Sequence, residues 1–258
     1  MSMNQPVARG QMMSQPLIIS DLLEYAARHH GEKTVISKRQ EGDIHQYSYK
    51  EALARSKQLA NALIKLDVQA GDRIATLAWN GYRHLECYYA ISGMGAICHT
   101  INPRLFSEQI EYIVQHAQDT YLFVDACFVS LLEPIMDQLS SVKAIIVMID
   151  PQQMPNTNLA NVINYEELIA QEFSEFNWPA LSPDTAACLC YTSGTTGNPK
   201  GVLYSHESTV LHAYASRNPD ALNISSDSVV MPVVPMYHVC AWGMPYIAPM
   251  AGATLVLP

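Results

Sequence analysis

The sequence predicts an α/β fold in which parallel sheets are flanked by helices, and three observations support this prediction. Amphipathic helical segments alternate with short apolar segments along residues 20–149, as they do in chains of βαβ units. The segment 74–79 is apolar at nearly every position, which is typical of a strand buried on both faces of a sheet. Hydrophobic residues make up 49% of the 258 residues and charged residues only 15%, a composition that excludes a disordered chain.

Each element is predicted from a local signal. Ser48-x-x-Glu51 is a capping box, so we expect a helix to begin there and to continue along the apolar stripe that ends near Leu66. Alternation of helices with apolar strands predicts parallel pairing through right-handed crossovers. We expect further helices over residues 20–31, 82–92, from 107 onward, 131–139 and 164–173, and strands over 34–37, 44–49, 74–79, 96–99, 121–124 and 144–149.

The predicted organisation has three parts. Residues 1–19 form a flexible leader, residues 20–183 form a first α/β subdomain, and residues 184–258 begin a second α/β subdomain that is incomplete. The 31 residues from 228 to 258 contain no charged side chain, but five prolines favour short strands and turns over a membrane helix. The chain stops on an apolar strand pattern at 254–258, whereas domains usually end in polar residues. We therefore expect the N-terminal piece of a longer, truncated protein.

Charge and cysteine usage exclude several classes of function. Fifteen Lys and Arg against 24 Asp and Glu give a net charge of −9, which does not suit a nucleic-acid-binding protein. The six cysteines lie mostly in apolar runs, as expected for reduced, buried thiols in a cytoplasmic protein. Cys188 and Cys190 point to the same side of a predicted strand. Because no further ligands at metal-site spacing are evident, we interpret them as buried thiols.

The segment Thr192-Ser193-Gly194-Thr195-Thr196-Gly197, followed by Lys200 and Gly201, carries the chemistry. Glycines let backbone amides approach a ligand closely, hydroxyls add donors and metal-binding oxygens, and the lysine adds a positive charge. This combination suits a polyphosphate. It is not a Walker A loop, because Lys200 is followed by glycine instead of serine or threonine.

The same segment resembles the phosphate loop of the adenylate-forming superfamily, which includes acyl-CoA synthetases. Two further segments resemble motifs of its medium- and long-chain fatty-acyl-CoA ligase branch: residues 95–105, with Asn102-Pro103-Arg104, and residues 235–243, with His238-Val239-Cys240-Ala241-Trp242-Gly243. The resemblance covers nearly all of residues 20–258 and implies the N-terminal domain of an adenylate-forming enzyme.

The resemblance also implies an activity and its cofactors. Enzymes of this branch use ATP and Mg²⁺ to convert a fatty or other carboxylic acid into an acyl-adenylate, and then transfer the acyl group to coenzyme A. It implies a cytoplasmic enzyme without a transmembrane segment, with a homodimer as one expected assembly.

Site roles follow from the same resemblance. Thr192 matches the Mg²⁺-contacting hydroxyl, and His238 matches a catalytic histidine beside the α-phosphate and carboxylate. Val239 and Trp242 match residues that line the nucleotide site and acyl tunnel, with the tryptophan as a gate. The β- and γ-phosphates would be cradled by Ser193, Gly194, Thr195, Thr196, Gly197 and Lys200.

Several alternatives remain open at this stage. Taken alone, His238 is typical of a hydrogen-bonded core histidine, and Trp242 of core packing. Cys240 stands where the branch has asparagine. The motif Tyr-Gly-x-Thr-Glu and the later catalytic lysine of the family are missing, so we expect this chain alone to be inactive. A catalytically inactive truncated remnant, serving as a nucleotide-binding or interaction module, is the main alternative; an amino-acid-activating domain is another.

Overall fold

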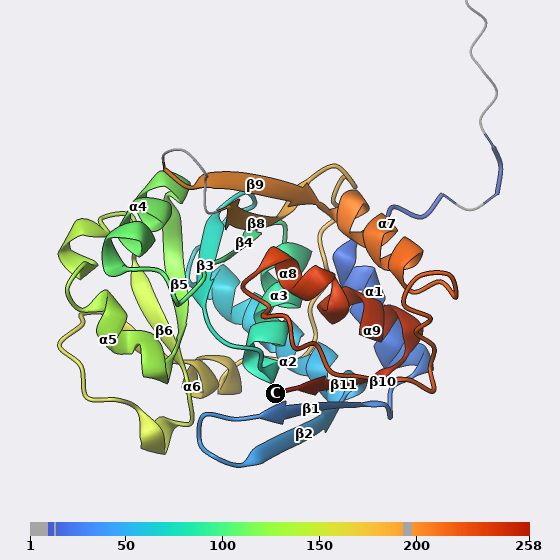
Figure 1. The fold of residues 1–258 in the computed structure, drawn as a ribbon, viewed down its shortest axis with the longest axis horizontal. Coiled ribbons are helices and arrows are strands. Elements are labelled where there is room, and N and C mark those ends of the chain that lie inside the picture. Colours follow the sequence, from blue (N-terminus) through green and yellow to red (C-terminus); the bar gives the residue numbers. More distant parts are fainter. Residues whose placement is uncertain (1–9, 13, 193–197) are drawn as a thin grey trace, which may run out of the picture.

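A computed structural model describes residues 10–12, 14–192 and 198–258 (Figure 1). The helices are α1 (Ile19–His29), α2 (Tyr49–Lys65), α3 (Tyr82–Gly93), α4 (Ser107–Ala117), α5 (Val129–Leu132), α6 (Tyr165–Ala170), α7 (His206–Ser216), α8 (Val239–Trp242) and α9 (Met244–Ala251). The strands are β1 (Thr34–Lys38), β2 (Ile44–Ser48), β3 (Arg73–Leu77), β4 (Ile97–Thr100), β5 (Asp119–Asp125), β6 (Ala144–Met148), β7 (Val162–Asn164), β8 (Ala186–Thr192), β9 (Lys200–Ser205), β10 (Val229–Val230) and β11 (Thr254–Leu257). Short 3₁₀ turns cover Ala126–Phe128, Met136–Gln138 and Pro151–Gln153.

The larger sheet has seven strands in the order β7-β6-β5-β3-β4-β8-β9. All neighbours pair in parallel except β8 and β9, which are antiparallel. One face packs against α2 and α3, through side chains such as Leu59 and Tyr88, and the other against α4, through Ile110 and Ile113. Helices on both faces explain why the central strands are apolar at nearly every position, and the predicted α/β class is confirmed.

The smaller sheet joins early and late parts of the chain in the order β10-β11-β1-β2. β11 runs parallel to β1, with Val35 opposite Leu255 (Figure 1, dark red beside blue). The strand predicted at residues 254–258 is therefore present as a core strand. Each sheet contains strands from before and from after residue 184, the predicted subdomain boundary. The two predicted subdomains therefore share both sheets, and the division itself remains a prediction.

The capping box at the start of α2 is confirmed in its atomic detail. The Ser48 hydroxyl accepts a hydrogen bond from the Glu51 amide at 3.3 Å, and the Glu51 carboxylate accepts one from the Ser48 amide at 2.7 Å. These two bonds satisfy backbone amides that have no partner inside the helix.

Two expectations need correction. The helix predicted over 131–139 is broken, because Pro134 follows α5 and only a 3₁₀ turn at Met136–Gln138 comes after it; proline disfavours a helical conformation in the residue before it and lacks an amide proton. The uncharged stretch 228–258 contains not only strands and turns but also α9, which tolerates Pro245 in its first turn and Pro249 inside. Within the described residues, no helix combines the length and apolarity needed to cross a membrane.

Candidate active site

The β8–β9 hairpin holds both ends of the predicted phosphate loop. Thr192 ends β8, Lys200 begins β9, and the two residues are direct partners in the ladder. Both are exposed, and the Thr192 hydroxyl makes a long hydrogen bond of 3.4 Å to the Lys200 carbonyl. Ser193, Gly194, Thr195, Thr196 and Gly197 lie outside the described residues. The strand register therefore brings the hydroxyl and the amine of the motif to the same end of the hairpin.

The segment 235–243 is held in place by hydrogen bonds from residues that the sequence analysis did not select. The Asn80 carboxamide accepts a hydrogen bond from the Met236 amide at 2.6 Å and donates to the Pro232 carbonyl at 2.9 Å. The buried Tyr88 hydroxyl donates to the Met236 carbonyl. These bonds hold Met236 in the core, and His238 is exposed two residues later. The alternative of His238 as a buried core histidine is therefore wrong.

Helix α8 is a left-handed turn. Val239, Cys240, Ala241 and Trp242 have φ values of 46°, 49°, 49° and 55°, and Gly243 follows at 80°. Left-handed backbone costs residues with a side chain roughly 1–2 kcal/mol each, so the surroundings must hold this turn in place. Cys240 and Ala241 are buried, while Val239 and Trp242 face outward with 39% and 61% of their surface exposed. Strain of this kind concentrates at functional sites.

A cavity of about 360 Å³ lies where the hairpin and this segment meet. Thr192 and Pro199 line it from the hairpin, and His238 and Val239 line it from the other side. Thr100, Asn102 and Gln109 add polar side chains to its lining. The structure thus brings Thr192, His238 and Val239 together around one space, although their segments are far apart in sequence.

A second cavity, of about 600 Å³, is more apolar. Its lining includes Trp242, Val239, Tyr246 and Leu222. Tyr204 and Val239 belong to the walls of both cavities, so the two spaces are neighbours. Trp242 lines only the second one, and its large exposed surface argues against the alternative of simple core packing.

The electrostatic setting suits an anion despite the net charge of −9. No Asp or Glu is found among the described residues that line either cavity. Burial raises the pKa of the shared Tyr204, and it raises that of Tyr191 to about 12. Both phenols therefore stay protonated and can donate hydrogen bonds at neutral pH. The Tyr191 hydroxyl lies 2.6 Å from Nδ1 of His116.

The sequence analysis gave no individual role to three supporting residues: Asn80, Thr100, which lies within the segment 95–105, and Tyr204. Asn80 follows a predicted strand in the turn Trp79-Asn80-Gly81, which offers a weak local signal. Thr100 and Tyr204 lie inside strands, and only the pairing of those strands shows that they reach the cavity.

The fold and the site define the chain as a member of the AMP-binding enzyme family, whose model matches residues 23–258. The chain is 51% identical over 249 residues to a 3-methylmercaptopropionyl-CoA ligase of Ruegeria lacuscaerulensis and 49% identical to a medium-chain-fatty-acid–CoA ligase of Ectopseudomonas oleovorans. Each match covers 96% of this chain and 46% of the relative. A long-chain-fatty-acid–CoA ligase of Thermus thermophilus is 44% identical, with 96% and 44% covered.

Solved structures share the fold. An anthranilate CoA ligase in complex with anthranoyl-AMP superposes with a TM-score of 0.85 at 21% identity, covering 97% of this chain and 46% of that one. A long-chain-fatty-acid–CoA ligase from Archaeoglobus fulgidus gives a TM-score of 0.81 at 20% identity, covering 99% and 49%. The chain spans about half the length of the relatives it matches.

Proposed function

We propose that this chain forms the nucleotide-binding and acyl-binding part of an ATP-dependent fatty-acid–CoA ligase. In this reaction a carboxylate attacks the α-phosphorus of ATP, so that an acyl-adenylate forms and pyrophosphate leaves. The thiol of coenzyme A then attacks the acyl carbonyl, and AMP leaves. Membership of the AMP-binding family and the names of the relatives support this reaction class.

The observation that carries the proposal is the 360 Å³ cavity between the hairpin and residues 237–239. A transfer from ATP to a carboxylate needs phosphate, carboxylate and donors held in one place, because positioning and charge neutralisation supply most of the rate. Thr192 and His238 face this one space, which would place the phosphates beside the hairpin and the reacting carboxylate beside the histidine. His238 would donate a hydrogen bond to the charge that develops on the phosphate oxygens.

Thr192 is suited to contact Mg²⁺. This ion prefers hard oxygen ligands and keeps several waters and phosphate oxygens around it. The Thr192 hydroxyl is exposed and engaged only by a long 3.4 Å bond, so it is free to add one such ligand. Mg²⁺, when bound, neutralises phosphate charge; Lys200 and the loop residues 193–197 would hold the β- and γ-phosphates.

The 600 Å³ cavity would take the acyl chain. Its aromatic and aliphatic walls favour an apolar tail. Val239 belongs to the walls of both cavities, and Trp242, which lines only this one, ends the same turn α8. We propose that Trp242 gates this passage. Trp242→Ala in the full-length protein should then shift the preferred acid length, seen in kcat/KM across a series of straight-chain acids, with little change in KM for ATP.

Acid-dependent pyrophosphate–ATP exchange by the full-length protein tests the reaction. We expect exchange with a medium-chain fatty acid, and a fall of about 10²–10³-fold in His238→Ala, the loss typical of removing one donor to transition-state charge. His29→Ala removes an exposed histidine from α1 and serves as a matched control that should keep full exchange. Equal exchange by both variants would contradict the role of His238.

A second acid class has a specific observation in its favour. The 51% identical relative is a 3-methylmercaptopropionyl-CoA ligase, so a short acid with a thioether is a competing substrate. Hydroxamate trapping with octanoate and 3-methylmercaptopropionate in parallel would rank the two acids by kcat/KM.

We further propose a cytoplasmic enzyme and a homodimer, as the resemblance to the fatty-acyl-CoA ligase branch implies. Light scattering coupled to size-exclusion chromatography of the full-length protein would give the mass of the assembly. If acids and ATP give no exchange while nucleotide still binds, the inactive nucleotide-binding remnant becomes the better explanation.

A further inference from the structure

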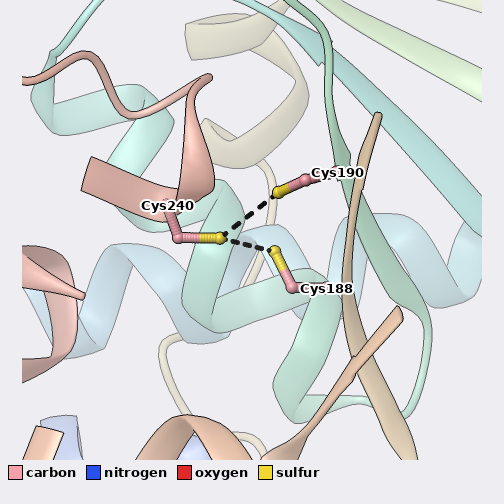
Figure 2. Close-up of side chains that lie close together, drawn as sticks. All are labelled: Cys188, Cys190 and Cys240. Atoms are coloured by element: carbon pink, nitrogen blue, oxygen red, sulfur yellow. Dashed lines mark hydrogen bonds between the residues drawn. The ribbon is translucent and has the colours of Figure 1, made fainter. Parts of the chain in front are cut away.

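Three cysteine side chains converge in the core beside the candidate active site (Figure 2). Cys188 and Cys190 extend from the same face of β8, and Cys240 approaches them from the left-handed turn α8. The Sγ atom of Cys240 lies 3.0 Å from that of Cys188 and 3.8 Å from that of Cys190. All three sulfurs lie within 4.8 Å of one another.

The cluster is buried and its ligand atoms are all soft. The exposed fractions of Cys188, Cys190 and Cys240 are 0%, 6% and 8%. Among the described residues, no histidine or carboxylate joins the three sulfurs. The Thr100 hydroxyl lies 3.3 Å from the Cys190 sulfur, and the buried Cys98 thiol, opposite Cys188 on β4, shares a hydrogen bond with Cys188. Thiolate sulfur selects monovalent copper and zinc over hard cations such as Mg²⁺. Zinc favours four ligands, whereas the group whose ligand atoms all lie within 4.8 Å of one another has three members among the described residues.

We propose that Cys188, Cys190 and Cys240 form a three-coordinate binding site for a soft metal ion, with monovalent copper as the best-fitting ion. The metal would link the strand that leads to the phosphate loop with the turn that carries His238 and Trp242. This site stands independently of the proposed ligase activity, because it uses only the geometry of the three sulfurs.

The geometry needs only small side-chain adjustments. A metal–sulfur distance of about 2.3 Å separates three sulfurs in a trigonal plane by about 4.0 Å. The observed sulfur–sulfur separations are 3.0 Å and 3.8 Å, so each of these two pairs would have to move apart by about 1 Å or less. A disulfide would instead require one pair to close to about 2.05 Å, and would leave the third converging thiol without a role.

The surroundings can support the charge of coordinated sulfur. The Tyr246 hydroxyl is buried and has no hydrogen-bond partner within the described structure, an arrangement that costs about 1–3 kcal/mol. Tyr246 lines the same cavity as Cys240, so its unpaired hydroxyl is a donor close to the cluster. Each sulfur that coordinates the metal releases its proton to solvent.

The test is an anaerobic titration of the reduced 258-residue chain with monovalent copper, in competition with the chelator bicinchoninate. We expect one copper per chain. Two variants each remove one sulfur ligand: Cys190→Ser, and Cys240→Asn, which introduces the residue that the fatty-acyl-CoA ligase branch carries here. Each should weaken copper binding by about 100-fold or more. Loss of a residue that only supports the ligands typically weakens metal binding by ~10–100-fold. Cys127→Ser, which removes the exposed cysteine outside the cluster, should bind as tightly as the parent chain.

X-ray absorption at the copper edge of the parent chain gives a readout that does not depend on how the variants fold. Three sulfur neighbours and no nitrogen or oxygen neighbour would support the proposal. Absence of binding, copper affinity unchanged in both Cys240→Asn and Cys190→Ser, or copper held by Cys127 would overturn it. So would a Cys188–Cys240 disulfide that persists in the chain under reducing conditions and excludes the metal.

Discussion

The carboxyl group of Asp125, at the end of β5, makes the free energy of unfolding depend on pH. Its Oδ2 accepts a hydrogen bond from the Trp79 amide at 2.8 Å, but desolvation outweighs this bond and raises its pKa from 3.8 to about 7. The folded state therefore prefers the protonated acid. Its contribution to stability is present below about pH 4, is lost as the pH rises through about 7, and changes little above that.

Asp125→Asn keeps an oxygen that can accept the Trp79 bond and removes the titration. We expect the difference in unfolding free energy between variant and parent to grow in favour of the variant from about pH 4 to pH 7, and to stay constant at higher pH. Urea unfolding at about pH 5, 6, 7 and 8 measures this difference. Asp137→Asn, on an exposed aspartate, is the control and should show no such trend; a flat difference for Asp125→Asn would contradict the raised pKa.

A buried ion pair gives a second prediction about single residues. Glu86 is fully buried; its Oε1 accepts from Arg55 Nε at 2.7 Å, and its Oε2 accepts from the Tyr165 hydroxyl at 2.6 Å. Arg55→Met leaves this carboxylate without its cation and should destabilise the chain by about 3–5 kcal/mol. Adding Glu86→Gln should restore part of the loss. The exposed pair Lys50–Glu32 is the control, and Lys50→Met should cost about 0–1 kcal/mol in the same urea unfolding experiment.

At the residue scale, sequence reasoning identifies the chemical groups but not what holds them. Thr192, Lys200 and His238 stand in recognisable motifs with local spacing. Asn80, which fixes Met236 from a position 156 residues away, cannot be found in this way, because its contact depends on how distant segments pack. Cys240 joins Cys188 and Cys190 for the same reason: strand alternation predicts the pair on β8 but not the third sulfur.

At the scale of elements, the left-handed turn α8 depends on the glycine that ends it. Gly243 has φ +80°, and a Cβ added there would lie 2.8 Å from Cδ2 of His212. Gly243→Ala therefore combines backbone strain of about 1–2 kcal/mol with a steric clash. Gly42 has φ +100° with nothing within 4 Å of an added Cβ, so Gly42→Ala measures the strain alone. We expect Gly243→Ala to lower the free energy of unfolding by clearly more than Gly42→Ala; equal losses would show that His212 moves aside freely.

Most elements follow from local sequence, and the exceptions have physical causes. The capping box at Ser48 and Glu51 and the buried strand β3 are local features, and both are present as predicted. The helix expected over 131–139 is divided at Pro134, a local signal that the prediction of one continuous helix did not take into account. Turn α8 could not be predicted, because residues with side chains adopt left-handed backbone only when the surrounding fold enforces it.

At the scale of the whole molecule, the two sheets show which information the sequence lacks. Apolar segments indicate strands, but strand order depends on non-local pairing, as when β11 adds beside β1 across more than 200 residues. The same long-range pairing brings β8 beside β4, with Cys188 opposite Cys98 and Cys190 opposite Thr100. The fold class could thus be predicted from alternation, whereas the meeting of the hairpin with residues 237–239 emerges only from the complete topology.

The last prediction concerns what the 258 residues can do alone. They span 46% of the ligase relatives that they match at about 50% identity, and they contain the two cavities but no Tyr-Gly-x-Thr-Glu sequence, whose glutamate the resemblance assigns to the Mg²⁺ site. We expect the purified chain to bind ATP weakly in isothermal titration calorimetry, with Thr192→Val weakening the binding further. We expect no acyl-CoA above background when acid, ATP, Mg²⁺ and coenzyme A are supplied, while the full-length protein turns over under the same conditions. Sustained turnover by the chain alone would show that its cavities hold every group the reaction needs.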